Sequence, residues 1–165
     1  MKYLVFSVLV LLVVFTARSQ NMTNAKLQAI VQQASDSIYQ QAVNYCEFKK
    51  MDRRLICITD SISNRMRIIS PIAEIQNLSV EQIIASMSAN FHAALDVKYA
   101  VSKGVMWAVY IHPLKELFKD QIEDAIAQVY NANVNFGTTY QSTPLFFGSP
   151  KESKESSNPT NNAKI

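Results

Sequence analysis

The sequence predicts a mainly α-helical fold, a single-domain bundle of about four amphipathic helices. Apolar residues recur every three or four positions through most of the chain, which is the spacing of one buried helix face. The chain holds only three glycines, and the first of them is Gly104. Proteins built of strands and tight turns ordinarily need glycine where φ is positive, so this scarcity also favours helices.

The first 19 residues have the layout of a secretory signal peptide. A short charged start is followed by an apolar stretch at 4–15, which is too short to span a bilayer, and small residues precede Gln20. A retained membrane anchor is the alternative. Lys2 and Arg18 lie in this segment, so the net charge of +3 falls to about +1 without it. We expect a secreted, extracellular protein with no transmembrane segment after cleavage.

The first two predicted helices lie on either side of residue 51. One apolar stripe spans residues 24–49 and the next spans residues 53–69. Ser70 ends the second helix, because the residue before a proline is pushed out of the α region. The two stripes consist of Leu27, Ile30, Val31, Ala34, Ile38, Ala42 and Tyr45, and of Leu55, Ile58, Ile62, Met66 and Ile69.

A capping box marks the start of the third predicted helix. Gln82 follows Ser79 by three residues, and such a pair satisfies free amide groups at a helix start. Gly104 is a suitable residue to follow the end of this helix. The expected buried stripe consists of Val80, Ile83, Ile84, Met87, Phe91, Ala94 and Leu95.

The fourth helix is predicted to start at Pro113, since proline favours the first helical position. Residues 105–111 are apolar throughout and fit a buried strand as well as a buried helix, so an α+β fold is the alternative. The chain beyond residue 140 becomes polar. We therefore expect a signal peptide at 1–19, a helical bundle domain at 20–140 and a flexible tail at 141–165.

The spacing of the two cysteines predicts an intrachain disulfide across a chain reversal. Cys46 and Cys57 lie eleven residues apart, which fits neither the close pairs of zinc sites nor the Cys-x-x-Cys spacing of redox sites. On one unbroken helix they would be about 16 Å apart, whereas a disulfide needs Cα atoms about 5.5 Å apart. The chain must therefore reverse near Met51 and Asp52. Two free or intermolecular thiols are the alternative.

Four basic residues surround the predicted reversal. Such a tip is either a solvated surface or a binding surface for a polyanion, a membrane or an acidic partner. Secretion and the nearly neutral charge of the mature chain argue against DNA as the partner. These residues are Lys49, Lys50, Arg53 and Arg54.

Two sequons predict glycosylation if the source is eukaryotic. They start at Asn21 and Asn77, and a third Asn-x-Thr at residue 158 is disqualified by its proline. The chain is therefore expected to be a glycoprotein with both asparagines at its surface.

The sequence carries no motif for catalysis. The serine-hydrolase elbow, the zinc-protease motif, the phosphate loop and the chelating loop of calcium sites are all absent from it, so we expect neither an enzyme nor a cofactor or metal. We predict an effector-like binding protein that meets an extracellular protein or polyanion through its helix surfaces. A carrier of a lipid or another small apolar molecule is the alternative. Its expected ligand wall consists of Phe91, Met106, Trp107, Tyr110 and Phe118.

Overall fold

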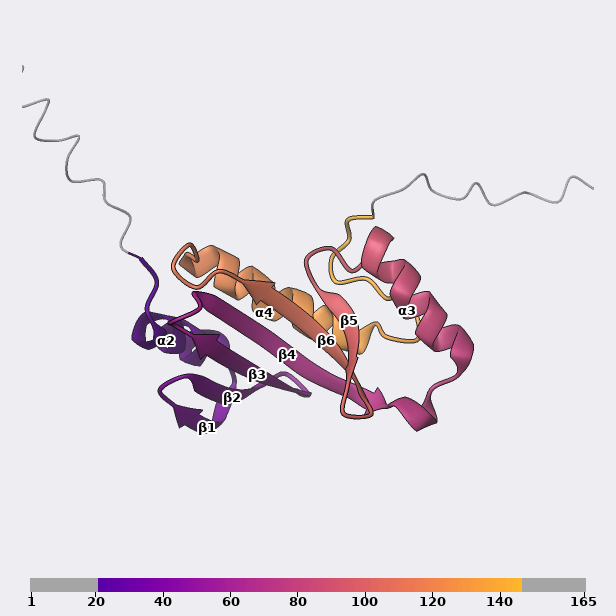
Figure 1. Cartoon of the computed structure of the whole chain (residues 1–165), viewed down its shortest axis with the longest axis horizontal. Coiled ribbons are helices and arrows are strands. Elements are labelled where there is room, and N and C mark those ends of the chain that lie inside the picture. Colours follow the sequence, from indigo (N-terminus) through magenta and orange to yellow (C-terminus); the bar gives the residue numbers. More distant parts are fainter. Residues whose placement is uncertain (1–20, 147–165) are drawn as a thin grey trace, which may run out of the picture.

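The computed structural model describes residues 21–146 and shows a mixed α/β fold (Figure 1). These residues form one six-stranded antiparallel sheet and three α-helices. The prediction of a mainly α-helical bundle is therefore wrong. The predicted signal peptide lies outside the described residues. No helix within 21–146 is long and apolar enough to cross a membrane.

The strands lie in the order β1-β2-β3-β4-β6-β5, and all neighbouring strands are antiparallel. Hairpins join β1 through β4, and α3 crosses from β4 to the outer strand β5. The elements are α2 (Asn24–Ala34), β1 (Ser37–Ala42), β2 (Tyr45–Lys50), β3 (Arg53–Asp60), β4 (Arg65–Glu74), the 3-10 helix η1 (Ile75–Asn77), α3 (Val80–His92), β5 (Lys98–Ser102), β6 (Val105–His112) and α4 (Lys119–Val134).

Residues 53–69, predicted as one helix, instead form most of the hairpin β3–β4. Leu55 and Cys57 would lie about 200° apart around a helix, but they share the buried side of β3 because strand side chains alternate with a period of two. The middle of β3 is apolar on both sides, with Ile56 buried as well. The sequence of this strand therefore shows no alternation of apolar and polar residues, and the spacing of its large apolar residues resembles that of a helix by chance.

Two of the tight turns between strands form without glycine. Met51 has φ 50° in the β2–β3 turn and Asn64 has φ 52° in the β3–β4 turn. Gly104 does not follow a helix but pairs with Lys103 in the two-residue turn between β5 and β6, where φ is 76° and 51°. Both angles are those of a type I′ hairpin turn. Scarcity of glycine was therefore a misleading argument against strands.

The hydrophobic core lies between the sheet and the helices α2 and α4, which both pack on one face of it. α4 starts at Lys119, not at Pro113, and runs along β4 and β6 (Figure 1). The opposite face of the sheet is not covered by any helix within the described residues. The fully buried core side chains include Leu27, Val31, Phe48, Leu55, Met66, Ile68, Met106, Ile122, Ile126 and Val129.

α3 closes part of the outer edge of the sheet. The Asn90 side chain donates from Nδ2 to the Tyr99 carbonyl (3.1 Å) and accepts at Oδ1 from the Tyr99 amide (2.7 Å). Both main-chain groups of Tyr99 point away from β6, and Asn90 satisfies both of them. α3 is thus fixed beside β5 and not over the face of the sheet.

Candidate binding surface

α3 turns its apolar side toward solvent. Val80, Ile84, Met87 and Phe91 are 60–80% exposed, although the sequence predicts them as the buried stripe of this helix. Their spacing of four, three and four residues places them in a single line along the helix. A line of large apolar side chains in water is unusual for a helix that belongs to one folded domain.

The fully buried positions of α3 are small residues, and the larger Ile83 packs beside them against the core. Ser86 and Ala89 are buried, and the Ser86 hydroxyl donates to the Ile83 carbonyl one turn earlier (2.7 Å). The predicted capping box is confirmed: Gln82 N–H donates to Ser79 Oγ (3.2 Å) and Ser79 N–H to Gln82 Oε1 (3.0 Å). The sequence predicts all the large apolar residues of α3 to be buried, but only Ile83 among them packs against the core, and Val80, Ile84, Met87 and Phe91 are exposed.

The region around α3 carries almost no charge. Between Ile75 and Leu95, Glu81 is the only acidic residue and there is no lysine or arginine. The centre of a protein interface is depleted in charge and enriched in methionine and aromatic residues, as Met87 and Phe91 are here. This composition distinguishes α3 from an ordinary solvated helix.

The last described residues extend the apolar surface beyond the end of α3. The Phe146 ring stacks on His92 with ring centroids 5.7 Å apart, and His92 meets Phe91 edge to face at 4.8 Å. Leu145 and Phe146 remain 49% and 45% exposed. We call the set Val80, Ile84, Met87, Phe91, Leu145 and Phe146 the α3 surface.

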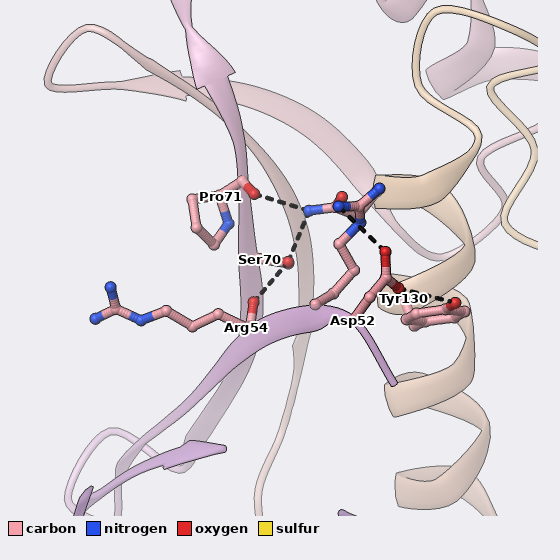
Figure 2. Close-up of polar contacts among 7 residues, drawn as sticks. Asp52, Arg54, Ser70, Pro71 and Tyr130 are labelled. Carbon is pink, nitrogen blue, oxygen red and sulfur yellow. Dashed lines mark hydrogen bonds and ion pairs between the residues drawn. The ribbon is translucent and has the colours of Figure 1, made fainter. Parts of the chain in front are cut away.

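The chain reverses at Met51 and Asp52 as predicted, and the basic residues around this turn are divided between the two sides of the hairpin. Lys50 and Arg53 lie on the side of the helices, where Lys50 Nζ donates to the Ala34 carbonyl (2.7 Å). Arg54 lies on the other side and forms a 2.7 Å ion pair with Glu47. Figure 2 shows the Arg54 side chain extending away from α4. The four basic residues therefore do not form one surface.

Glu47 receives two interactions that stabilise its charge. The Tyr45 hydroxyl donates to its carboxylate (2.8 Å), and the Arg54 guanidinium is the second partner. The hydrogen bond from Tyr45, together with the guanidinium, lowers the pKa of Glu47. Part of the basic charge near the turn is thus neutralised within the chain.

Polar contacts join this hairpin to the last helix. Asp52 accepts a hydrogen bond from the Tyr130 hydroxyl (3.3 Å) at the turn (Figure 2). Further along, Asn133 Nδ2 donates to Ser70 Oγ and to the Pro71 carbonyl, both at 2.8 Å, and the Ser70 hydroxyl donates to the Arg54 carbonyl (2.7 Å). α4 is therefore held on β3 and β4 by hydrogen bonds as well as by apolar packing.

The two cysteines are direct neighbours but are not bonded. Cys46 and Cys57 are paired across β2 and β3, as a chain reversal requires, yet both are free and buried, so the predicted disulfide is wrong. Burial, with a smaller effect of Cys46, raises the pKa of the Cys57 thiol to about 12, and burial also raises that of Cys46. Neutral buried thiols are poor nucleophiles, so the pair acts as part of the core.

We expect stability to fall in alkaline solution through Cys57. An unfolded thiol loses its proton near pH 9, whereas the folded one keeps it to about pH 12. The free energy of unfolding therefore keeps its full value below pH 9 and declines as the pH rises toward 12, by up to about 1.4 kcal/mol per pH unit. Urea unfolding as a function of pH measures it. Cys57→Val should make the decline shallower while leaving the contributions of Cys46 and Tyr99, whose pKa values burial also raises. A wild-type profile without decline above pH 9 would contradict this.

The residues predicted as a ligand wall do not line a common cavity. Met106 and Tyr110 are buried under α4, whereas Trp107 lies on the uncovered side of the same strand. Phe91 is on α3, and Phe118 is the 60% exposed residue that precedes α4. The structure therefore separates these five residues into four places.

The two sequon asparagines are both exposed. Asn21 opens the described part of the chain, and Asn77 ends η1 just before α3. Glycosylation at either position remains a prediction.

Comparisons with known proteins show the fold alone. No family model matches the chain, and no curated protein matches it. Among solved structures, a chain of the "Structure of the HopA1-SchA Chaperone-Effector Complex" is similar, with a TM-score of 0.53 and 9% identity. The likeness covers 68% of this chain and 94% of that one. The neighbour is thus a component of a chaperone–effector complex.

Proposed function

We propose that this chain is a non-enzymatic binding protein whose partner is another protein that docks on the α3 surface. The observation that carries the proposal is the exposure of Val80, Ile84, Met87 and Phe91 along one line of a helix that packs on the protein through its other side. Covering these side chains with a complementary apolar surface would remove them from water, which is favourable in proportion to the area buried.

Two further findings support a protein partner. The scarcity of charge between Ile75 and Leu95 suits close contact with an apolar protein surface, and it means that added salt should have little effect on binding. The similar solved structure comes from a complex between two proteins, a chaperone and an effector. We carry over from it only the idea that such a fold can bind protein.

We also propose that the protein acts outside the cytoplasm. The layout of residues 1–19 as a signal peptide carries this part of the proposal. The exposure of Asn21 and Asn77 is compatible with modification during secretion.

The test is a paired substitution on α3. Ile84→Glu with Phe91→Glu should abolish capture of the partner from the secreted proteins of the source cells, measured by quantitative mass spectrometry. The free energy of unfolding should change by less than about 1 kcal/mol, since both side chains are exposed.

The matched control is Val101→Glu on β5, a residue that is 53% exposed outside the α3 surface. It should capture the same protein as the wild type. Retention of that protein by the α3 variant, or its loss in the control, would overturn the proposal.

The second candidate function is that of a carrier of a small apolar molecule, and one hollow in the surface supports it. A depression of about 530 Å³ lies beside the start of α2, with Met22, Ala25, Val43 and Leu114 among its lining residues. Native mass spectrometry of protein purified from its source tests this candidate. A ligand that co-purifies with the wild type and is lost in Val43→Arg would favour this candidate. Wild-type protein that shows only the mass of the chain would refute it.

A further inference from the structure

The uncovered face of the sheet carries a strip of apolar side chains. Strand residues alternate, so the neighbours of the buried Leu55, Ile68 and Ala108 point to the face away from α2 and α4. In β4 and β6 this strip is built of facing pairs, Ile69 with Val109 and Pro71 with Trp107. The strip consists of Ile56, Ile58, Ile69, Pro71, Trp107, Val109 and Ile111.

Two hollows lie along this strip. One of about 330 Å³ includes Arg54, Pro71 and Trp107 in its lining, and one of about 360 Å³ includes Arg67 and Ile111. The facing pairs Arg67–Ile111 and Pro71–Trp107 are four residues apart along β4, which corresponds to about 13 Å. The face therefore offers two places for side chains separated by a little more than two helical turns.

Basic residues border the strip on both sides and at one end. Three acidic residues share the face, but Glu47 is paired with Arg54, and the Asp60 carboxylate accepts from the amides of Ile62 (3.0 Å) and Ser63 (2.9 Å). Within residues 21–146, Arg67 forms no ion pair. The basic residues are Lys49, Arg54, Arg65, Arg67 and Lys98, and the third acidic residue is Glu74. Arg54 is engaged by Glu47, and Lys98 Nζ donates to the carbonyls of Asn90 and Leu95 at the end of α3, so Lys49, Arg65 and Arg67 are the basic residues left for a partner.

We propose that this face binds an acidic amphipathic helix of a partner protein. Apolar side chains at positions i, i+4 and i+8 of such a helix lie on one side and span about 12 Å, close to the separation of the two hollows, which the outer two would enter. Its flanking carboxylates would meet Lys49, Arg65 and Arg67, which form no ion pair within residues 21–146, and the helix would cover this face as α4 covers the other. A second copy of the chain does not fit, because it would bring two basic faces together.

The experiment uses two synthetic peptides of about 15 residues with the same apolar positions, flanked by glutamate in one and by lysine in the other. The glutamate peptide should bind the purified protein, shift the backbone NMR signals of β4 and β6, and bind more weakly as salt is added. The lysine peptide should not bind. Equal binding of both peptides, or stronger binding to phosphatidylserine vesicles than to phosphatidylcholine vesicles, would overturn the proposal.

Arg67→Glu should weaken binding of the glutamate peptide at least about tenfold while leaving the unfolding midpoint unchanged. Lys115→Glu, a charge reversal at an exposed residue outside this face, should bind as the wild type does. Unchanged affinity in Arg67→Glu, or a change in its oligomeric state, would contradict the proposal. Ile84→Glu with Phe91→Glu should still bind the peptide, so failure of this site and of the α3 surface can be told apart.

Discussion

Phe48→Ala is expected to lower the free energy of unfolding by about 3–5 kcal/mol, the largest single effect that we predict. Phe48 is fully buried in β2, between Ile38 on β1 and Leu55 on β3. Its replacement removes the transfer free energy of the ring and leaves a cavity that the surrounding strands can close only in part. Urea unfolding followed by circular dichroism measures the loss.

Tyr39→Ala is the matched control for this prediction. Tyr39 is also aromatic and lies in the adjacent strand β1, but it is 57% exposed, so its removal should cost less than about 1 kcal/mol. Similar losses in the two variants would show that β1 and β2 do not pack as the structure has them.

The second large effect is expected for Asn133→Ala, which should lower the free energy of unfolding by about 2–3 kcal/mol. Asn133 is only 7% exposed, and its side-chain amide donates to both Ser70 Oγ and the Pro71 carbonyl. The register of β4 shifts just after Pro71, so this carbonyl lies where the regular pairing with β6 is interrupted. Without Asn133, buried acceptors lose their donor and cannot reach water.

Asn133→Asp separates the hydrogen bonds from the packing. A carboxylate has nearly the same shape as the amide but cannot donate to the Pro71 carbonyl, so this variant should be at least as unstable as Asn133→Ala at neutral pH. It should regain stability as the pH falls and the carboxyl acquires a proton. Val134→Ala, next along the helix at a 40% exposed position, should change stability by less than about 1 kcal/mol. A loss in Val134→Ala equal to that in Asn133→Ala would contradict the role given to the amide.

Features fixed by neighbouring residues could be predicted from the sequence. The Ser79–Gln82 capping box is a local pattern and forms as predicted. The reversal at Met51 and Asp52 was also predicted, although it was inferred from a disulfide that does not form, and the two cysteines do come side by side. The cysteines meet in a pair of strands and not in a pair of helices. That choice depends on distant parts of the chain.

Strand β3 could not be recognised because it is apolar on both sides although helices cover only one face of the sheet. In β4 the alternation of Arg65, Met66, Arg67 and Ile68 was present, but the apolar spacing of three and four residues favoured a helix. Ile56, Ile58 and Ile69 face away from the helices but are largely shielded by neighbouring side chains. A central strand that is apolar on both sides loses the alternation that identifies strands. The intervals between its large residues then resemble those of a helix.

The α3 surface was missed for a different reason. Periodicity shows that Ile84, Met87 and Phe91 share one side of a helix, but it does not show which side faces the core. The packing of α3 through Ser86 and Ala89 follows from the position of β5 and of residues 135–142, which no local pattern reveals. The function proposed for this chain therefore rests on an arrangement of elements and not on a motif.

The side chain of Asn90 at the edge of the sheet affects whether the protein aggregates at high concentration. An unpaired strand edge is a template on which another chain can add a strand, and repeated addition produces fibres. Asn90 occupies the outward amide and carbonyl of Tyr99, and on the opposite edge β1 is interrupted by a register shift between Ile38 and Gln40. Neither edge of the described sheet offers a long regular row of free backbone groups. The protein can therefore expose large apolar side chains on its faces without presenting a template for polymerisation.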